Sequence, residues 1–319
     1  MTAGFREDFA RSRPFPLDGF QIRAFDALDA GRSVLVAAPT GSGKTLVGEY
    51  AVERALAAGK KAFYTTPLKA LSNQKFGDFS RSLGADRVGL LTGDTAVRGE
   101  APVVVMTTEV LRNMIYARSG ALDDLGVVVL DEVHYLQDPS RGAVWEEVII
   151  HLPPEVRIVA LSATVSNAEE VADWLRGVRG ETDTVIEERR PVSLVNLYLV
   201  GDRAAERPHL LPTFVGTGSE RRPNPLATRL VSGGGSRRDR PGRRRRLYRP
   251  WRAEVVEVLA EESMLPAIVF VFSRAGCDQA VDQCVAAGLR PANAEERAGL
   301  REIADRHLDP LADDDLDAL

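Results

Sequence analysis

Residues 38–45 read Ala38-Pro39-Thr40-Gly41-Ser42-Gly43-Lys44-Thr45 and stand between an apolar run at 34–38 and a helical pattern that begins near Thr45. A chain of phosphates is bound by inward-turned backbone amides, the positive N-terminus of a helix, a flexible cation and a hydroxyl for Mg²⁺. Gly41 and Gly43 permit close approach of the backbone. Lys44 can reach the β- and γ-phosphates, and Thr45 can bind Mg²⁺. The stretch predicts a phosphate-binding loop, whose remaining members are Pro39, Thr40 and Ser42.

Apolar runs rich in β-branched residues alternate with longer helical stretches from residue 34 onward. This alternation is typical of a parallel sheet covered by helices, in which the strands are apolar on both faces. We therefore expect an α/β fold, a phosphate-loop sheet with helices on both faces. The expected strands lie at residues 34–38, 62–65, 88–91, 103–106, 127–130 and 158–161, and the expected helices include 46–58 and 68–83.

The pattern changes after residue 190. A strand-like run at 194–200 precedes residues 201–250, whose glycine, proline and arginine content cannot bury enough apolar surface to fold alone, so we expect a linker. Beyond it we expect a helix at 251–262, a buried strand at 267–272 and a helix near 275–287. The expected organisation is an N-terminal segment (1–32), a main domain (33–190), a connector (191–250) and the start of a second α/β unit with an acidic tail (251–319).

The charge of the chain is local. Residues 220–252 hold twelve arginines, one glutamate and one aspartate, a net charge of +10, so the other residues carry −15 within a total of −5. The arginines at 237, 238 and 243–246 have two open interpretations. They can grip phosphates with a strong salt dependence, or they can form a solvated linker that charge keeps soluble.

The two cysteines and the lack of a long apolar run in the sequence are typical of a cytoplasmic protein. Cys277 and Cys284 are seven residues apart in one expected helix, too far for a disulfide bond, so we expect small core residues of a cytosolic protein. No apolar run approaches the ~20 residues that span a bilayer, and residues 1–13 do not resemble a signal peptide. We expect a cytoplasmic protein without membrane contact. No zinc site is expected, because His151, His209 and His307 lack companions at ligand spacing.

A second motif, Asp131-Glu132-Val133-His134, follows the expected strand at 127–130. It places two adjacent carboxylates at the C-terminal end of a buried strand, where open α/β sheets bind their ligands. Asp131 can hold Mg²⁺ through a bound water, while Glu132 can orient an attacking water and accept its proton. A phosphate loop alone fits a kinase, a GTPase or a motor, and the carboxylate pair favours a motor.

With these two motifs the sequence resembles the superfamily 2 helicases of the DEAD/DEAH kind. Further stretches are similar to the superkiller-like branch, the large exosome-associated RNA helicases and their actinobacterial relatives. The resemblance runs in the family's order from residue 15 to about residue 190. The stretches are 65–75 (beginning Thr65-Thr66-Pro67-Leu68-Lys69), 89–94 (Gly89-Leu90-Leu91-Thr92-Gly93-Asp94), 106–114 (beginning Met106-Thr107-Thr108-Glu109), 141–147 (beginning Arg141-Gly142) and 161–170 (beginning Leu161-Ser162-Ala163-Thr164).

The resemblance implies a RecA-like lobe that binds ATP and Mg²⁺, with Thr45 and Asp131 at the metal. It implies that Gln21 reads the adenine edge beside a stacking phenylalanine, and that His134 joins Lys44, Asp131 and Glu132 in catalysis. Residues 162–164 (Ser162, Ala163 and Thr164) would couple hydrolysis to strand movement. The implied contacts to a nucleic-acid backbone are Thr66, Pro67, Lys69, Asn73, Gln74, Gly93, Asp94, Thr108 and Glu109.

The activity implied is that of an ATP-dependent RNA helicase on single-stranded or partly duplex RNA, with RNA-degradation machinery as a partner by family analogy. A DNA helicase is an alternative, because motifs that contact the phosphate backbone do not distinguish ribose from deoxyribose. A non-catalytic, nucleotide-dependent binding module also remains open.

Family members complete the ATP site with arginines from a second lobe. Only the first strand and helix of such a lobe are expected here, from residue 265 onward. Because one arginine can be worth ~10³–10⁵ in rate, we expect an N-terminal portion of a longer helicase that binds ATP–Mg²⁺ weakly and does not unwind alone.

Overall fold

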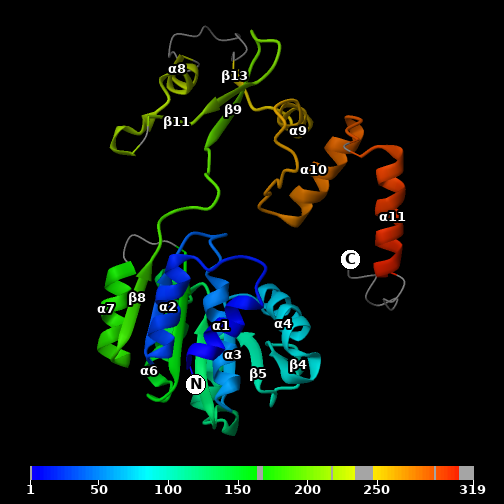
Figure 1. Ribbon diagram of the computed structural model, residues 1–319. Helices are drawn as coiled ribbons and strands as arrows, with labels where there is room; N and C mark the ends of the chain where they lie inside the picture. Colours follow the sequence, from blue (N-terminus) through cyan, green and yellow to red (C-terminus); the bar gives the residue numbers. More distant parts are fainter. Residues whose placement is uncertain (1, 164–167, 217, 234–246, 291, 309–319) are drawn as a thin grey trace. The chain divides into compact units, whose positions relative to one another are not determined.

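The computed structural model describes residues 2–163, 168–216, 218–233, 247–290 and 292–308 (Figure 1). The chain divides into two units, Met1–Ser193 and Leu194–Leu319, which are described separately. Within the described residues, no helix is both long enough and apolar enough to cross a membrane.

The first unit is built on an eight-stranded sheet with the strand order β4-β3-β5-β2-β6-β7-β1-β8. Every pairing is parallel except that of β4 with β3. The six expected strands are confirmed, and β4 and β8 are additions. The strands are β1 (Ser33–Ala37), β2 (Lys61–Thr66), β3 (Val88–Leu91), β4 (Ala96–Val97), β5 (Val103–Thr107), β6 (Leu125–Leu130), β7 (Arg157–Ser162) and β8 (Thr182–Ile186).

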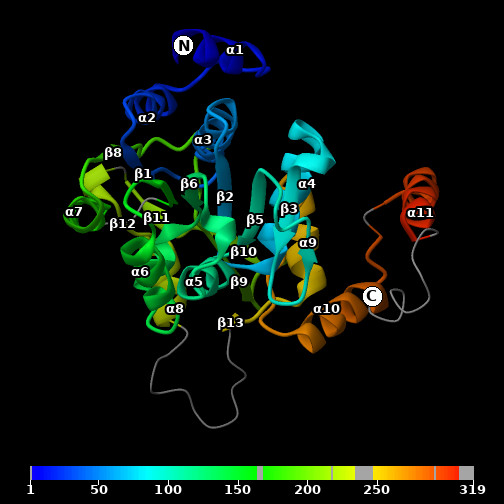
Figure 2. The same ribbon diagram turned by 90° about the horizontal axis from the view of Figure 1, so that it is seen from below.

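Helices cover both faces of this sheet, as Figure 2 shows and as the expected α/β fold requires. Successive strand residues point to opposite faces, so Val34 and Val36 join one core cluster while Leu35 joins the other. The helices on the first face are α1 (Thr2–Arg11), α2 (Gly19–Asp29), α3 (Thr45–Ala57) and α4 (Lys69–Leu83). Those on the second face are α5 (Thr108–Tyr116), α6 (Gly142–His151) and α7 (Ala168–Arg179). Short 3₁₀ helices lie at η1 (Ala85–Arg87), η2 (Gly120–Leu122) and η3 (Val133–Gln137).

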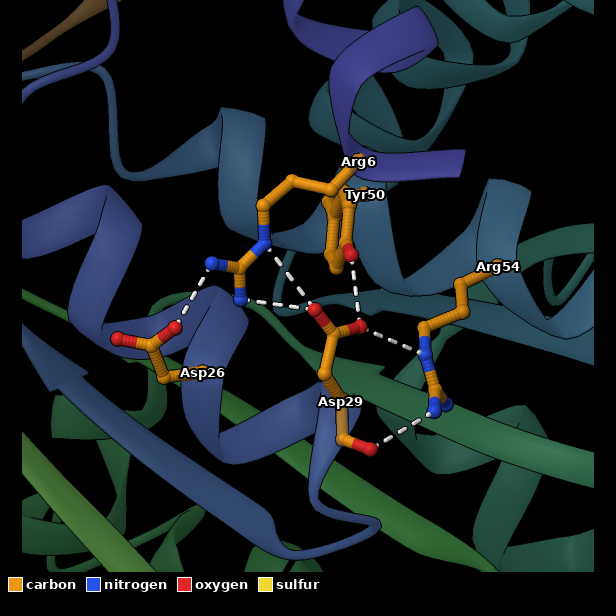
Figure 3. Close-up of polar contacts among 5 residues, drawn as sticks. All are labelled: Arg6, Asp26, Asp29, Tyr50 and Arg54. Carbon is orange, nitrogen blue, oxygen red and sulfur yellow. Dashed lines mark hydrogen bonds and ion pairs between the residues drawn. The ribbon is translucent and has the colours of Figure 1, made fainter. Parts of the chain in front are cut away.

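A polar network joins the first three helices around Asp29 (Figure 3). The Asp29 carboxylate accepts hydrogen bonds from Tyr50 Oη (2.7 Å), Arg54 Nε (3.1 Å) and Arg6 Nε (3.1 Å). Arg6 also pairs with Asp26 at 2.7 Å. Since Tyr50 and Arg54 belong to α3, the network fixes the helix that follows the phosphate loop against α1 and α2.

The second unit corrects the expectation of a plain linker over residues 201–250. The described part of this segment forms short strands that pair in antiparallel fashion, and a helix. The Tyr248 ring lies against Gly201, where a Cβ would come within 2.5 Å of it. The elements are β9 (Leu197–Asp202), β10 (His209–Pro212), β11 (Phe214–Val215), η4 (Gly218–Glu220), β12 (Arg222–Pro223), α8 (Pro225–Gly233) and β13 (Leu247–Tyr248). The arginines at 237, 238 and 243–246 lie outside the described residues.

The expected buried strand at 267–272 is wrong. In the structure this run has no strand hydrogen bonding, and Ile268, Phe270 and Phe272 are 83%, 86% and 107% exposed. An apolar run becomes a strand only where neighbouring strands satisfy its backbone, and the described residues supply none here. The expected helices on either side are confirmed as α9 (Arg252–Glu261) and α10 (Arg274–Ala286), and α11 (Ala294–Leu308) follows them.

Both cysteines lie in α10, as expected, and both are free thiols. Cys277 is exposed and Cys284 is partly exposed, so the expectation of core cysteines is wrong. The physical reason is that α10 buries none of its described side chains.

Candidate functional site

The strand order brings the two principal motifs to one edge of the sheet. β6, β7 and β1 are consecutive, and all three are parallel. The phosphate loop leaves β1, the acidic pair at 131–132 leaves β6, and Ser162 ends β7. Parallel strands end at the same edge, so these groups form one site without any long connection.

The phosphate loop has the backbone that its glycines predict. Gly41 and Gly43 have φ values of +84° and +85°, the left-handed region that side chains rarely adopt. The loop precedes α3, whose first amides have no partner within the helix. Ser42 Oγ is buried without a hydrogen-bond partner, and the Lys44 side chain is only 8% exposed. A shielded cation, a buried hydroxyl without a partner and a turned backbone fit a phosphate chain.

Glu132 stands between the cation and the histidine of the second motif. Its Oε1 lies 3.8 Å from Lys44 Nζ, and its Oε2 lies 3.3 Å from His134 Nδ1. Glu132 also has a φ of +53°, which is uncommon for a residue with a side chain. Such strain costs about 1–3 kcal/mol and is found where the surrounding structure imposes it, often at active sites. Lys44 and His134, both predicted to act with Glu132, therefore each lie within 4 Å of its carboxylate.

Asp131 is held by a residue that the sequence motifs did not indicate. Its Oδ2 accepts a 2.8 Å hydrogen bond from the hydroxyl of Tyr64 on β2, and its Oδ1 accepts one from its neighbour's amide. Burial, and next the charge of Asp131, raise the pKa of Tyr64 well above its ordinary value, so the hydroxyl remains a donor. A tyrosine within a buried strand usually has a polar partner, and that was the available signal.

The donor set suits Mg²⁺ bound together with phosphates. Thr45 is partly exposed at the start of α3, and Asp131 directly follows β6 at the same edge of the sheet. Hydroxyl and carboxylate oxygens are hard ligands of the kind Mg²⁺ uses, with waters and phosphate oxygens completing its shell. The described residues contain no group of three or more His, Cys, Asp or Glu able to hold a metal ion by themselves. The residues present therefore fit a metal that arrives with a nucleotide.

A pocket beside the phosphate loop contains the expected base-reading residue. It is lined by Gln21, Phe15, Gly43, Thr45 and other residues of α3 and the 12–15 segment. Gln21 Nε2 donates to Gly43 O at 3.1 Å, and its Oε1 accepts from Asp18 N at 2.9 Å. Phe15 is 51% exposed at the pocket, whereas Phe20 is buried in the core. Of these two phenylalanines, only Phe15 is exposed at the pocket.

The expected backbone contacts gather at the ends of β2, β3 and β5, which are adjacent in the sheet. They divide into two groups. Exposed are Lys69, Asn73, Gln74, Gly93 and Asp94, and Glu109 is partly exposed. Buried are Pro67, Thr66 and Thr108. Thr66 Oγ1 hydrogen-bonds to Ser72 Oγ at 2.7 Å, and Thr108 Oγ1 donates to Thr66 O at 3.4 Å. The two hydroxyls thus bond within the chain.

The expected coupling motif is seen only in part. Ser162 is buried at the end of β7, and its Oγ has no hydrogen-bond partner. It lines a small cavity together with His134 and Ala37. Ala163 is partly exposed, and Thr164 lies outside the described residues. Ser162 therefore lines the same cavity as His134 of the second motif.

The comparisons with known proteins agree with this geometry. Residues 18–171 match the model of the DEAD/DEAH box helicase family. The chain is 53% identical to the probable helicase HelY of Mycobacterium tuberculosis, over 98% of this chain and 35% of that protein. It is 42% identical to the chloroplastic DExH-box ATP-dependent RNA helicase DExH15 of Arabidopsis thaliana, over 84% of this chain and 26% of that protein. It is 38% identical to human superkiller complex protein 2, over 85% of this chain and 23% of that protein.

The chain thus spans about a third or less of the length of these relatives. The matched region begins just before Gln21 and ends in α7, so it contains the phosphate loop, the acidic pair and Ser162. Residues 18–171 are a DEAD/DEAH box helicase domain, within a chain similar to the HelY and superkiller-type helicases.

Proposed function

We propose that this chain binds ATP with Mg²⁺, and a nucleic-acid backbone, as part of an ATP-dependent RNA helicase. One observation carries the proposal: Lys44 Nζ lies 3.8 Å from Glu132 Oε1, at the sheet edge where Asp131 directly follows β6. A cation for phosphates and a carboxylate for water within one site are what hydrolysis of a phosphoanhydride requires.

Each residue of the site has a separate task in this proposal. The loop amides and Lys44 hold the phosphates, while Glu132 orients a water for attack on the terminal phosphorus and accepts its proton. His134 lies beside the second oxygen of Glu132 and limits its rotation. Mg²⁺, when bound, neutralises phosphate charge, and Thr45 and Asp131 are the residues that would hold it. Gln21 and Phe15 would position the base.

RNA is the substrate we propose, with DNA as the alternative that the experiment must separate. The support is comparative, since one relative is named an RNA helicase and another a superkiller complex protein. The residues exposed at the ends of β2 and β3 are suited to a backbone and read no base. We therefore propose binding of single-stranded RNA without sequence preference, and RNA-degradation machinery as a partner of the whole protein.

The proposal is tested first by binding to the 319-residue chain. A fluorescent ATP analogue with Mg²⁺ should bind the native chain, and Lys44→Ala should weaken that binding at least tenfold. Lys60→Ala is the matched control, because Lys60 is half exposed and pairs with Asp124 instead. Equal binding by the native chain and Lys44→Ala would contradict the assigned site.

ATP hydrolysis and the preference for RNA over DNA are tested next. In the full-length protein Glu132→Gln should abolish ATP turnover while nucleotide binding remains. Single-stranded RNA and DNA of the same sequence should be compared for binding and for stimulation of ATPase. A preference for DNA would overturn the RNA assignment and leave the nucleotide site intact.

A further inference from the structure

An ion pair joins the start of a helix to a loop at the edge proposed to bind nucleic acid. Lys69 is the first residue of α4, the helix that follows β2, and its Nζ pairs with Oδ2 of Asp94. Asp94 lies between β3 and β4. Because β5 stands between β3 and β2 in the sheet, the pair connects segments that follow the strands on either side of β5, the strand from which α5 starts.

The carboxylate of this pair is fixed in place. Asp94 Oδ1 accepts a 2.9 Å hydrogen bond from Thr92 Oγ1, and Thr92 N donates to Thr95 O at 2.8 Å. The hydrogen bond from Lys69, and next that from Thr92, lower the pKa of Asp94, which therefore stays ionised at neutral pH. Side chains in the pair are 50% exposed for Lys69 and 63% exposed for Asp94. A phosphate approaching the edge meets both charges together.

The pair places opposite demands on a nucleic-acid ligand. Lys69 would attract a phosphodiester, whereas an ionised carboxylate beside it repels the same group. Asp94 has no proton to donate to a phosphate oxygen. A phosphate can therefore gain the full charge of Lys69 only by displacing Asp94.

We infer that Asp94 competes intramolecularly with the nucleic-acid backbone for Lys69, so that this contact is weakened and readily released. The inference rests on the proposed nucleic-acid binding and specifies how one contact of that site is regulated. Its ligand is the phosphodiester of a single strand, which suits a motor that must release each contact it makes. Lys69 alternates between Asp94 in the free chain and a phosphate in the bound one.

The test uses four forms of the 319-residue chain: native, Lys69→Ala, Asp94→Asn and the double variant. Binding of a fluorescent oligouridylate is measured by anisotropy at several KCl concentrations. Asp94→Asn should bind about two- to fivefold more tightly, the scale of an exposed ion pair. Its slope of log K against log salt should steepen by about 0.7, one additional phosphate on a single strand.

The role of Lys69 should depend on residue 94. Lys69→Ala should change affinity less than about 1.5-fold when Asp94 is present, and should remove the whole gain when Asn is present. Asp78→Asn is the matched control, because it changes the charge by the same amount as Asp94→Asn and lies on α4, the helix that Lys69 begins. Asp78 pairs with Lys75 and Arg81, within α4. This control should leave RNA binding unchanged.

Several outcomes would overturn the inference. If Asp94→Asn weakens RNA binding without lowering the thermal unfolding midpoint, Asp94 is a direct contact, such as an acceptor for a ribose hydroxyl. If Lys69→Ala weakens binding equally in both backgrounds, the two residues act independently. Both results leave the proposed function standing. Failure of the native chain to bind any oligonucleotide would instead reject the proposed nucleic-acid site and this inference with it.

Discussion

The Tyr64 hydroxyl donates a 2.8 Å hydrogen bond to Oδ2 of Asp131, and both side chains are buried. The strands that carry them, β2 and β6, are paired, and Asp131 N also donates to Thr65 O at 2.9 Å. The carboxylate assigned to the metal is thus oriented from the neighbouring strand. That strand continues within two residues into Thr66 and the loop leading to Lys69.

Tyr64→Phe should lower the affinity for Mg²⁺, so that a higher Mg²⁺ concentration is needed to support nucleotide binding. Removing the hydroxyl leaves Oδ2 of Asp131 without this donor, and loss of such an outer partner of a metal ligand costs about tenfold or more in metal affinity. The measurement is a Mg²⁺ titration of fluorescent ATP analogue binding. Nucleotide binding in the absence of Mg²⁺ should be unchanged.

Tyr50→Phe is the control for this experiment, since it removes a buried tyrosine hydroxyl that bonds to Asp29 instead. It should reduce stability and leave the Mg²⁺ titration unchanged. If Tyr64→Phe gives the native titration, the hydroxyl does not position Asp131 for metal binding.

Gly43→Ala should harm the nucleotide site more than Gly41→Ala. Both glycines have nearly the same positive φ. Placing an alanine in this left-handed conformation costs about 1–2 kcal/mol of stability at either position. Only at Gly43 would the new Cβ meet a neighbour, Gln21 Nε2 at 2.9 Å, whereas Gly41 faces open space. ATP-analogue affinity and thermal unfolding should both fall further for Gly43→Ala.

The steric explanation is checked with Gln21→Ala. Combined with Gly43→Ala, it should recover part of the lost thermal stability, because the colliding amide is gone. Strictly additive losses in the double variant would show that the backbone strain alone is responsible.

The strands that the sequence predicts well are those buried on both faces. Residues 103–106, for instance, are fully buried in β5 and show a continuous apolar run. β8 escaped prediction because Thr182, Asp183 and Thr184 lie at the sheet edge, where only β1 pairs with it. The prediction of a strand at 267–272 was wrong for the opposite reason. The composition of this run favours a strand, but strand formation depends on neighbouring strands, which composition does not encode.

The same distinction applies to the site. The phosphate loop and the acidic pair are local patterns, and their spacing in the fold follows from parallel strands ending together. Tyr64 could not be found in this way, because its role depends on its position beside Asp131 across two strands. Thr66 and Thr108 were expected to face a ligand, yet both are fully buried, which a polar loop motif does not reveal.

Asp29→Ala should destabilise the first unit strongly. It removes the acceptor shared by Arg6, Tyr50 and Arg54, and breaking such a partly buried ionic network costs about 3 kcal/mol. Asp26→Ala is the control, since Asp26 is 60% exposed, and its loss should cost less than about 1 kcal/mol. Urea unfolding monitored by far-UV circular dichroism measures both. Equal costs would mean that the network adds no stability beyond a surface pair.

Alkaline pH should destabilise the same network through Tyr50. Burial, and next the hydrogen bond to Asp29, raise the pKa of Tyr50 from 10.0 to about 12, although Arg6 opposes the shift. Between these values the folded chain binds more protons than the unfolded one, so the free energy of unfolding falls as pH rises. The contribution is complete below pH 10 and declines by at most about 1.4 kcal/mol for each pH unit above it. Tyr50→Phe lacks this titration, so the stability difference between native chain and variant should be constant from pH 8 to 9.5 and should shrink above pH 10. A difference that stays constant to pH 11 would show that the Tyr50 hydroxyl is not protected by Asp29 and burial.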